Sequence, residues 1–249
     1  MALSEMGTSA LATPSPASRS ILGFAMDHTL PNLQPRRHAS VLFAAPFLLA
    51  ALVAAPASAT ESSFPPAPLP PASVWQPVEE VRAYAVSGST GIDLYRSIGE
   101  RGPAAGVGQA VAVTTFKLTW TRDYRPQPDG ACVLAVAKPR LIITYTLPRA
   151  PKNLTSSVAE NWQRFIDGVE KHERVHGTQI IDMVRGIETF SRGLREENDP
   201  KCTKVRQTLQ ARLKQFSDER VAQSRAFDQV ELTEGGAVHR LILALVNGP

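Results

Sequence analysis

One long amphipathic segment, residues 157–193, constrains the fold more than any other feature. On a helical wheel at 100° per residue, its apolar side chains fall in one stripe and its charged side chains on the opposite side. Ser157 and Glu160 have the spacing of a capping box, and Gly193 is a typical stop signal. The pattern therefore predicts a single long helix with one buried face. The stripe contains Trp162, Phe165, Ile166, Val169, Ile180, Met183, Val184, Ile187 and Phe190.

Three polar residues, His172, Glu173 and His176, interrupt this apolar stripe. Burying an unpaired carboxylate costs several kcal/mol, roughly, or forces it to take up a proton. Histidines at i and i+4 of a helix can bind one Zn²⁺, with the glutamate between them serving as general base toward a water. The segment thus predicts a zinc site in which His172 and His176 are ligands and Glu173 is catalytic. The alternative is a histidine pair hydrogen-bonded to Glu173 and the backbone.

The N-terminal residues resemble an export signal rather than part of a folded domain. Arg36 and Arg37 precede an apolar run, and the small residues at 57–59 fit a signal-peptidase site, so we expect a signal peptide over 1–59, cleaved after Ala59. The alternative is an uncleaved membrane anchor, but the run is short for a span. Translation starts at Met1 or, with a signal of more usual length, at Met26. The predicted location is periplasmic or secreted, with no stable membrane span after cleavage.

A proline-rich linker is predicted over 60–77, followed by one domain over 78–249. The formal charge of +4 arises from mixed acidic and basic residues and gives no basic footprint, so we expect no nucleic-acid partner.

Residues 78–148 have the character of strands and turns. Residues 110–120 alternate and are rich in β-branched and aromatic side chains, and residues 131–147 resume the extended pattern after a turn-forming segment. They predict an antiparallel hairpin, with Pro139 at a bulge or an edge, joined by an earlier strand at 81–86. A short helix is expected to end at Gly102 and Pro103, and a second long helix to begin near Thr203. The predicted fold class is α+β, a small antiparallel sheet packed on the two long helices.

Cys132 and Cys202 are the two cysteines of the chain. In an exported protein they most simply form a disulfide, which would stabilise the fold by about 3–5 kcal/mol. Two separately buried thiols are the alternative.

Several segments, taken in order, resemble the DUF922 family of exported bacterial proteins. The resemblance rests on "YAVSGSTGIDLYRSIGERGP", "TTFKLTW", the two cysteines, "NWQRFIDGVEKHERVHG" and "FDQVELTEGG". It implies a zinc-dependent protease-like domain with a disulfide. One position departs from the family pattern, because Thr233 stands where the C-terminal signature has a histidine.

The third zinc ligand is therefore open. A catalytic zinc needs three protein ligands and a free position. Glu234 is the preferred candidate, since a shift of one residue in a glycine-rich turn would bring its side chain to the vacated place. Glu231, Asp228 and His239 are the alternatives.

The leading hypothesis is an exported zinc-dependent peptide hydrolase acting on a peptide or protein substrate of the cell envelope. The alternative is a non-catalytic envelope module that keeps a structural or vestigial metal site.

Overall fold

A computed structural model describes residues 75–105 and 108–248 of the chain. The predicted signal peptide, and the predicted linker up to residue 74, lie outside the described residues. In the part that is described, none of the helices combines the length and the apolar character that a membrane span requires.

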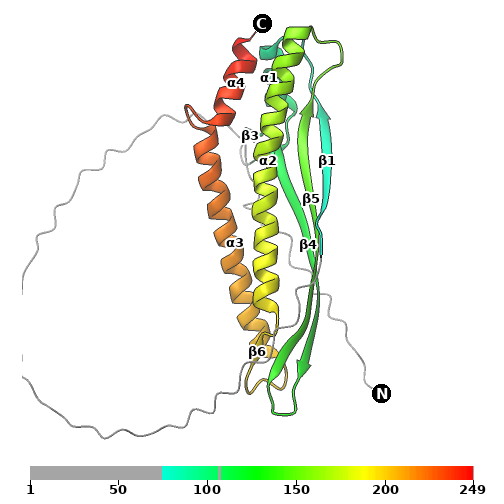
Figure 1. Cartoon of the computed structure of the whole chain (residues 1–249), viewed down its shortest axis with the longest axis vertical. Helices are drawn as coiled ribbons and strands as arrows, with labels where there is room; N and C mark the ends of the chain where they lie inside the picture. The colour runs from blue at the N-terminus through cyan, green and yellow to red at the C-terminus, as the bar shows by residue number, and fades with distance from the viewer. Residues whose placement is uncertain (1–74, 106–107, 249) are drawn as a thin grey trace, which may run out of the picture. The chain divides into compact units, whose positions relative to one another are not determined.

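The sheet is built on one long hairpin of β4 (Val113–Pro126) and β5 (Cys132–Arg149), paired antiparallel (Figure 1). This confirms the predicted hairpin, although β4 continues through residues that we assigned to the turn. Strand β1 (Val78–Ala85) pairs with β5 in parallel, so the sheet is mixed and has the order β1-β5-β4. The direction of β1 follows from helix α1 (Gly91–Arg101), which separates β1 from the hairpin along the chain. Short strands complete the pairing: β2 (Ala104–Ala105) with β3 (Gly108–Gln109), and β6 (Arg195–Glu196) with β5.

Pro139 lies in β5 opposite Trp120 of β4. The opposite edge of β5 pairs with β6 at residues 132–133 and with β1 at residues 142–149. Around Pro139 this edge is therefore unpaired in the described sheet. A proline is tolerated there because one edge needs no ladder hydrogen bond. The irregularity in the hairpin falls elsewhere, between Asp123 and Tyr124.

Helix α2 (Ser156–Ser191) lies against the sheet and is the predicted long helix (Figure 1). Its N-cap is Thr155, so Ser157 already lies within the helix and the predicted capping box does not form. At the other end, Gly193 has a φ of 73°, the left-handed conformation expected after a helix C-cap. The stop signal was therefore identified correctly.

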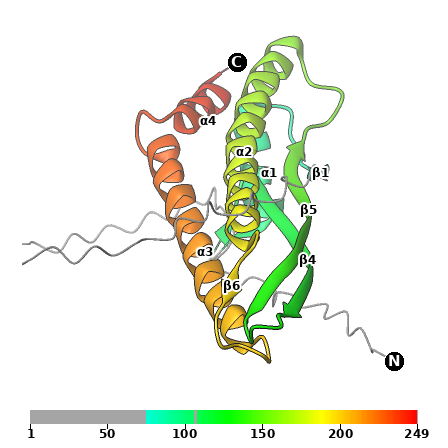
Figure 2. The same ribbon diagram turned by 60° about the horizontal axis from the view of Figure 1, so that its bottom comes forward.

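Helix α3 (Thr203–Leu232) begins where the sequence predicted and runs antiparallel beside α2 (Figures 1 and 2). It is followed by α4 (Ala237–Asn247), which the sequence analysis did not predict. Helix α4 packs its apolar face, including Val238, Ile242 and Leu245, into a core cluster shared with α1 and the first half of α2.

A second core cluster joins the sheet to the later half of α2 and the start of α3, and includes the disulfide between Cys132 and Cys202. On α2 the first cluster ends at Val169 and the second begins at Ile180. Between them the buried positions of α2 are His172, Glu173, His176 and Gly177. The polar triplet thus lies where the two apolar cores meet.

Gly177 allows the sheet to approach α2 beside the triplet. A Cβ at this position would lie 2.0 Å from the hydroxyl oxygen of Tyr145, a fully buried side chain on β5. Gly168 and Gly186 admit Leu241 of α4 and Phe216 of α3 in a similar way. Each glycine of α2 therefore permits contact with a different element.

We expect Gly177→Ala to lower the free energy of unfolding by about 1–3 kcal/mol, because the Tyr145 ring has no space to move aside. This holds despite the roughly 1 kcal/mol that alanine contributes relative to glycine in a helix. Urea denaturation of the purified domain measures the change. The matched control is Gly99→Ala in α1, where an added Cβ meets nothing within 4 Å. If both variants were equally stable, the close contact with Tyr145 would be refuted.

Candidate metal centre

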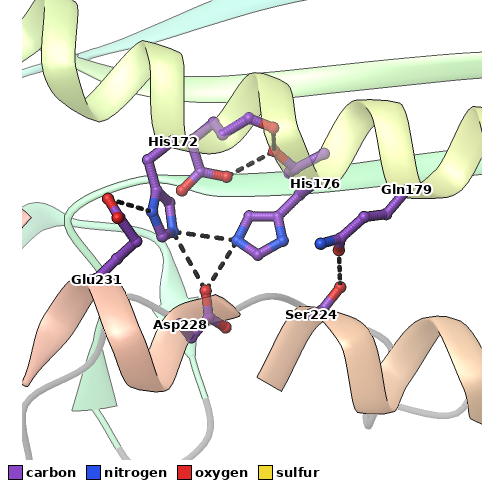
Figure 3. A network of polar contacts seen from close by, with 8 residues as sticks. His172, His176, Gln179, Ser224, Asp228 and Glu231 are labelled. Atoms are coloured by element: carbon purple, nitrogen blue, oxygen red, sulfur yellow. Dashed lines mark hydrogen bonds and ion pairs between the residues drawn. The ribbon is translucent and has the colours of Figure 1, made fainter. Parts of the chain in front are cut away.

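Two imidazole rings from adjacent turns of α2 point together toward α3 (Figure 3). Their Nε2 atoms, on His172 and His176, are 3.1 Å apart. Both side chains are about 1% exposed, as the wheel predicted for the apolar stripe. The i, i+4 spacing on a helix produces this arrangement because successive turns place such side chains one above the other.

Asp228 of α3 supplies the third group. Its Oδ1 lies 2.8 Å from His176 Nε2 and 3.2 Å from His172 Nε2 (Figure 3). Two ligand atoms bound to one tetrahedral Zn²⁺ at about 2.05 Å would be roughly 3.3 Å apart. The three atoms thus converge with the spacing of a tripod of metal ligands, and His172, His176 and Asp228 form a group able to hold a metal ion.

The charge state of Asp228 suits this role. Burial favours the neutral acid, but hydrogen bonds from His172 and His176 outweigh it and hold the pKa of Asp228 below its ordinary value. The aspartate is therefore ionised at neutral pH, as a carboxylate ligand must be.

Glu173 lies on the sheet side of the same helix turn and is completely buried. Its Oε2 accepts a hydrogen bond of 2.5 Å from the hydroxyl of Thr114 on β4, whereas Oε1 has no hydrogen-bond partner among the described residues. Burial raises the pKa of Glu173. A nearby divalent cation would oppose that rise, because opposite charge favours the ionised form. The orphaned Oε1 and the convergent ligand atoms both fit a bound metal ion.

The two rings are held in place by packing. Phe227 stacks on His172 with ring centroids 4.7 Å apart and meets His176 edge-on at 5.4 Å. Glu231 faces the other nitrogen of His172, with Oε2 3.9 Å from Nδ1, which is beyond hydrogen-bond distance. Glu231 thus occupies the side of the ring away from Asp228, where carboxylates commonly orient metal-binding histidines.

The structure brings Asp228, and not the preferred Glu234, to the two histidines. The reason is that α3 continues to Leu232, so Asp228 is still helical and faces α2. Glu234 follows the end of the helix in an exposed turn. His239 is likewise not part of the group, since its Nδ1 accepts a hydrogen bond from the backbone of Gly235.

Two contributors were missed by the sequence analysis. Thr114 carried no signal, since its contact with Glu173 depends on how a strand and a helix pack. Phe227 was noted only as part of the family pattern. Phe227 continues the stripe of Leu209, Leu213 and Phe216 along α3, and extending that stripe would have placed Phe227 against α2, with Asp228 next to it in the chain.

Fold and site together define an α+β domain with a candidate metal centre between two long antiparallel helices. The chain belongs to the DUF922 family, described as "Bacterial protein of unknown function", whose model matches residues 81–236. This agrees with the resemblance drawn from the sequence motifs. No curated protein and no solved structure matches the chain.

Proposed function

We propose that this domain is an exported zinc-dependent peptide hydrolase. The observation that carries the proposal is the convergence of two imidazole nitrogens and a carboxylate oxygen, all within 3.2 Å of one another, in the interior between two apolar cores. Two histidines and one carboxylate are the ligand set of several catalytic zinc sites, in which the fourth position remains open. The disulfide is compatible with a location outside the cytoplasm.

In this proposal His172, His176 and Asp228 hold the metal ion. When bound, zinc supplies Lewis acidity, polarising the scissile carbonyl and lowering the pKa of a water molecule. Phe227, stacked on His172, keeps that ring in position.

Glu173 is the general base. The hydrogen bond from Thr114 fixes Oε2, which leaves Oε1 free to accept a proton from the attacking water and to deliver it to the leaving amine. The low exposure of this carboxylate removes competing water, which strengthens its interactions with developing charge. Thr114 thus acts as a positioning residue.

Glu173→Gln tests the general base. The amide keeps the size of the side chain, so the variant should retain one zinc per chain while its hydrolytic rate falls by about 10²–10⁴-fold. Zinc is measured in protein prepared without chelators, and hydrolysis is measured on a mixed peptide library and on cross-linked muropeptides. Wild-type protein without stoichiometric zinc would remove the basis of the proposal.

A second candidate, a structural metal site in a non-catalytic envelope module, is favoured by one observation. The ligand side chains are almost closed from solvent, Asp228 being the most exposed of the three at 15%. In that case wild type and Glu173→Gln would both hold zinc, neither would hydrolyse any substrate, and removal of zinc would lower only the stability of the domain.

A further inference from the structure

Residues 217–231 of α3 belong to neither of the two apolar cores. They cover about four turns of helix, roughly 22 Å, and of this described stretch only Arg220 and Ser224 are buried. Apolar contacts hold α3 on either side of the stretch, which we call the strap. The side chains that α3 contributes to the cores are Val205, Leu209, Leu213 and Phe216 in one cluster and Leu232 in the other.

The contacts between the strap and α2 are polar and centre on the metal site. Ser224 donates a hydrogen bond of 2.7 Å to Gln179 of α2 (Figure 3). One turn further along, Asp228 approaches the Nε2 atoms of the two histidines, at 2.8 and 3.2 Å. Phe227 contacts the same two imidazole rings rather than a member of either core. The strap is therefore held to α2 mainly where the ligand atoms converge.

Arg220 opposes this closed position of the strap. The residue is 4% exposed, and its Nε and Nη2 atoms have no hydrogen-bond partner within the described parts of the chain. Burial lowers the pKa of Arg220. Its guanidinium carbon lies 5.7 Å from the ring centroid of Phe116 on β4, but a cation–π contact does not replace the hydration that a buried charge loses. Separation of the strap would return this charge to water.

We propose that the strap is a cover latched by the metal ion. It lies against α2 while Asp228 shares the ion with His172 and His176, and it separates from α2 and β4 when the ion is absent. The inference rests on the metal ligands of the proposed function and does not require hydrolysis.

Two features of the site support a moving cover. The two imidazole side chains are about 1% exposed and Asp228 is 15% exposed, so a metal ion reaches them only if an element moves aside. Helix α2 has residues in both cores, whereas the strap has none, and segments with few apolar contacts are the ones that open locally. An ion bound by α2 and the strap together stabilises the closed position, because the full ligand set exists only there.

Hydrogen–deuterium exchange of the purified protein, with and without zinc, tests the latch. A helical stretch of this length is marginal in water once its packing is lost, so its amides exchange when the strap separates. Zinc at 100 times its dissociation constant should slow exchange in the strap by up to about 100-fold, since it binds only the closed position. Residues 203–216 and helix α4, which pack in the apolar cores, should exchange equally in both states.

Three variants in zinc-free protein test the role of Arg220. Arg220→Met keeps the contact with Phe116 and removes the buried charge, so exchange in the strap should slow by at least about tenfold. Ser224→Ala removes the hydrogen bond to Gln179 and should speed exchange. The matched control is Arg225→Met, an exposed arginine of the strap, which should exchange as the wild type does. Circular dichroism checks that each variant is folded.

The opposite signs of the first two effects separate an opposing charge from an ordinary packing residue. Unchanged or faster exchange in folded Arg220→Met protein would overturn the inference, as would equal protection of the strap with and without bound zinc. Zinc-dependent protection in a protein that hydrolyses no peptide would support the latch and refute the hydrolase. Hydrolysis by a protein whose strap is equally protected in both states would refute the latch and support the hydrolase.

Discussion

Asp228→Ala is expected to lower the affinity for zinc by more than about 100-fold. Changes to outer-shell residues already cost 10–100-fold, roughly, and loss of a direct ligand should exceed that. The physical reason is that Asp228 Oδ1 approaches both ligand nitrogens, at 2.8 and 3.2 Å, and carries the negative charge of the tripod. Competition with a chromophoric chelator measures the affinity, and metal analysis gives the stoichiometry.

Glu234→Ala is the control for this prediction. It removes the carboxylate that we preferred from the sequence because it neighbours the family histidine position, and that the structure places in an exposed turn. Its zinc affinity should equal that of the wild type. The opposite result, weak binding by Glu234→Ala and normal binding by Asp228→Ala, would show that the end of α3 rearranges when metal binds.

Zinc binding should also stabilise the packing of α3 against α2, since two ligands come from one helix and the third from the other. Asp228→Ala then removes this metal link without altering either apolar core.

The helices were largely predictable because their signals are local. The apolar stripe of α2 repeats over many turns, and Gly193, Asp199 and Pro200 mark the break before α3. The parallel pairing of β1 and the existence of α4 were not predictable in this way. Strand direction depends on the path of the chain through α1, and the short apolar segment that forms α4 packs in a core cluster with residues of α1 and α2, which are distant in the sequence.

The α2 half of the site followed from the sequence for the same reason. His172, Glu173 and His176 could be identified because they are polar residues on an otherwise apolar helix face. Asp228 and Thr114 belong to elements 56 and 59 residues away along the chain from their partners, and only tertiary packing brings them together. The preference for Glu234 assumed that a neighbouring residue replaces the family histidine, whereas the structure places Asp228, five residues before Thr233, against the two histidines.

Replacing both Cys132 and Cys202 by serine is expected to lower the free energy of unfolding by about 4 kcal/mol. The disulfide closes a loop between residues 70 positions apart, and the chain-entropy estimate for a loop of that length is of this size. The bond joins the start of β5 to the residue that precedes α3, where Cys202 has a left-handed φ of 56°. Urea denaturation of both proteins, loaded with zinc to the same extent, measures the difference.

This loss should leave the metal centre intact as long as the protein remains folded. Asp228 lies about 39 Å along α3 from Cys202, and the site lies between the two apolar cores rather than at the end that the disulfide anchors. At low temperature and without urea, the double serine variant should therefore bind one zinc with the wild-type affinity, while Asp228→Ala loses zinc and keeps the disulfide. A double variant as stable as the wild type would mean that the loop is already constrained in the unfolded chain. Loss of zinc by the folded double variant would mean that the position of α3 against α2 is set from the disulfide end of the helix.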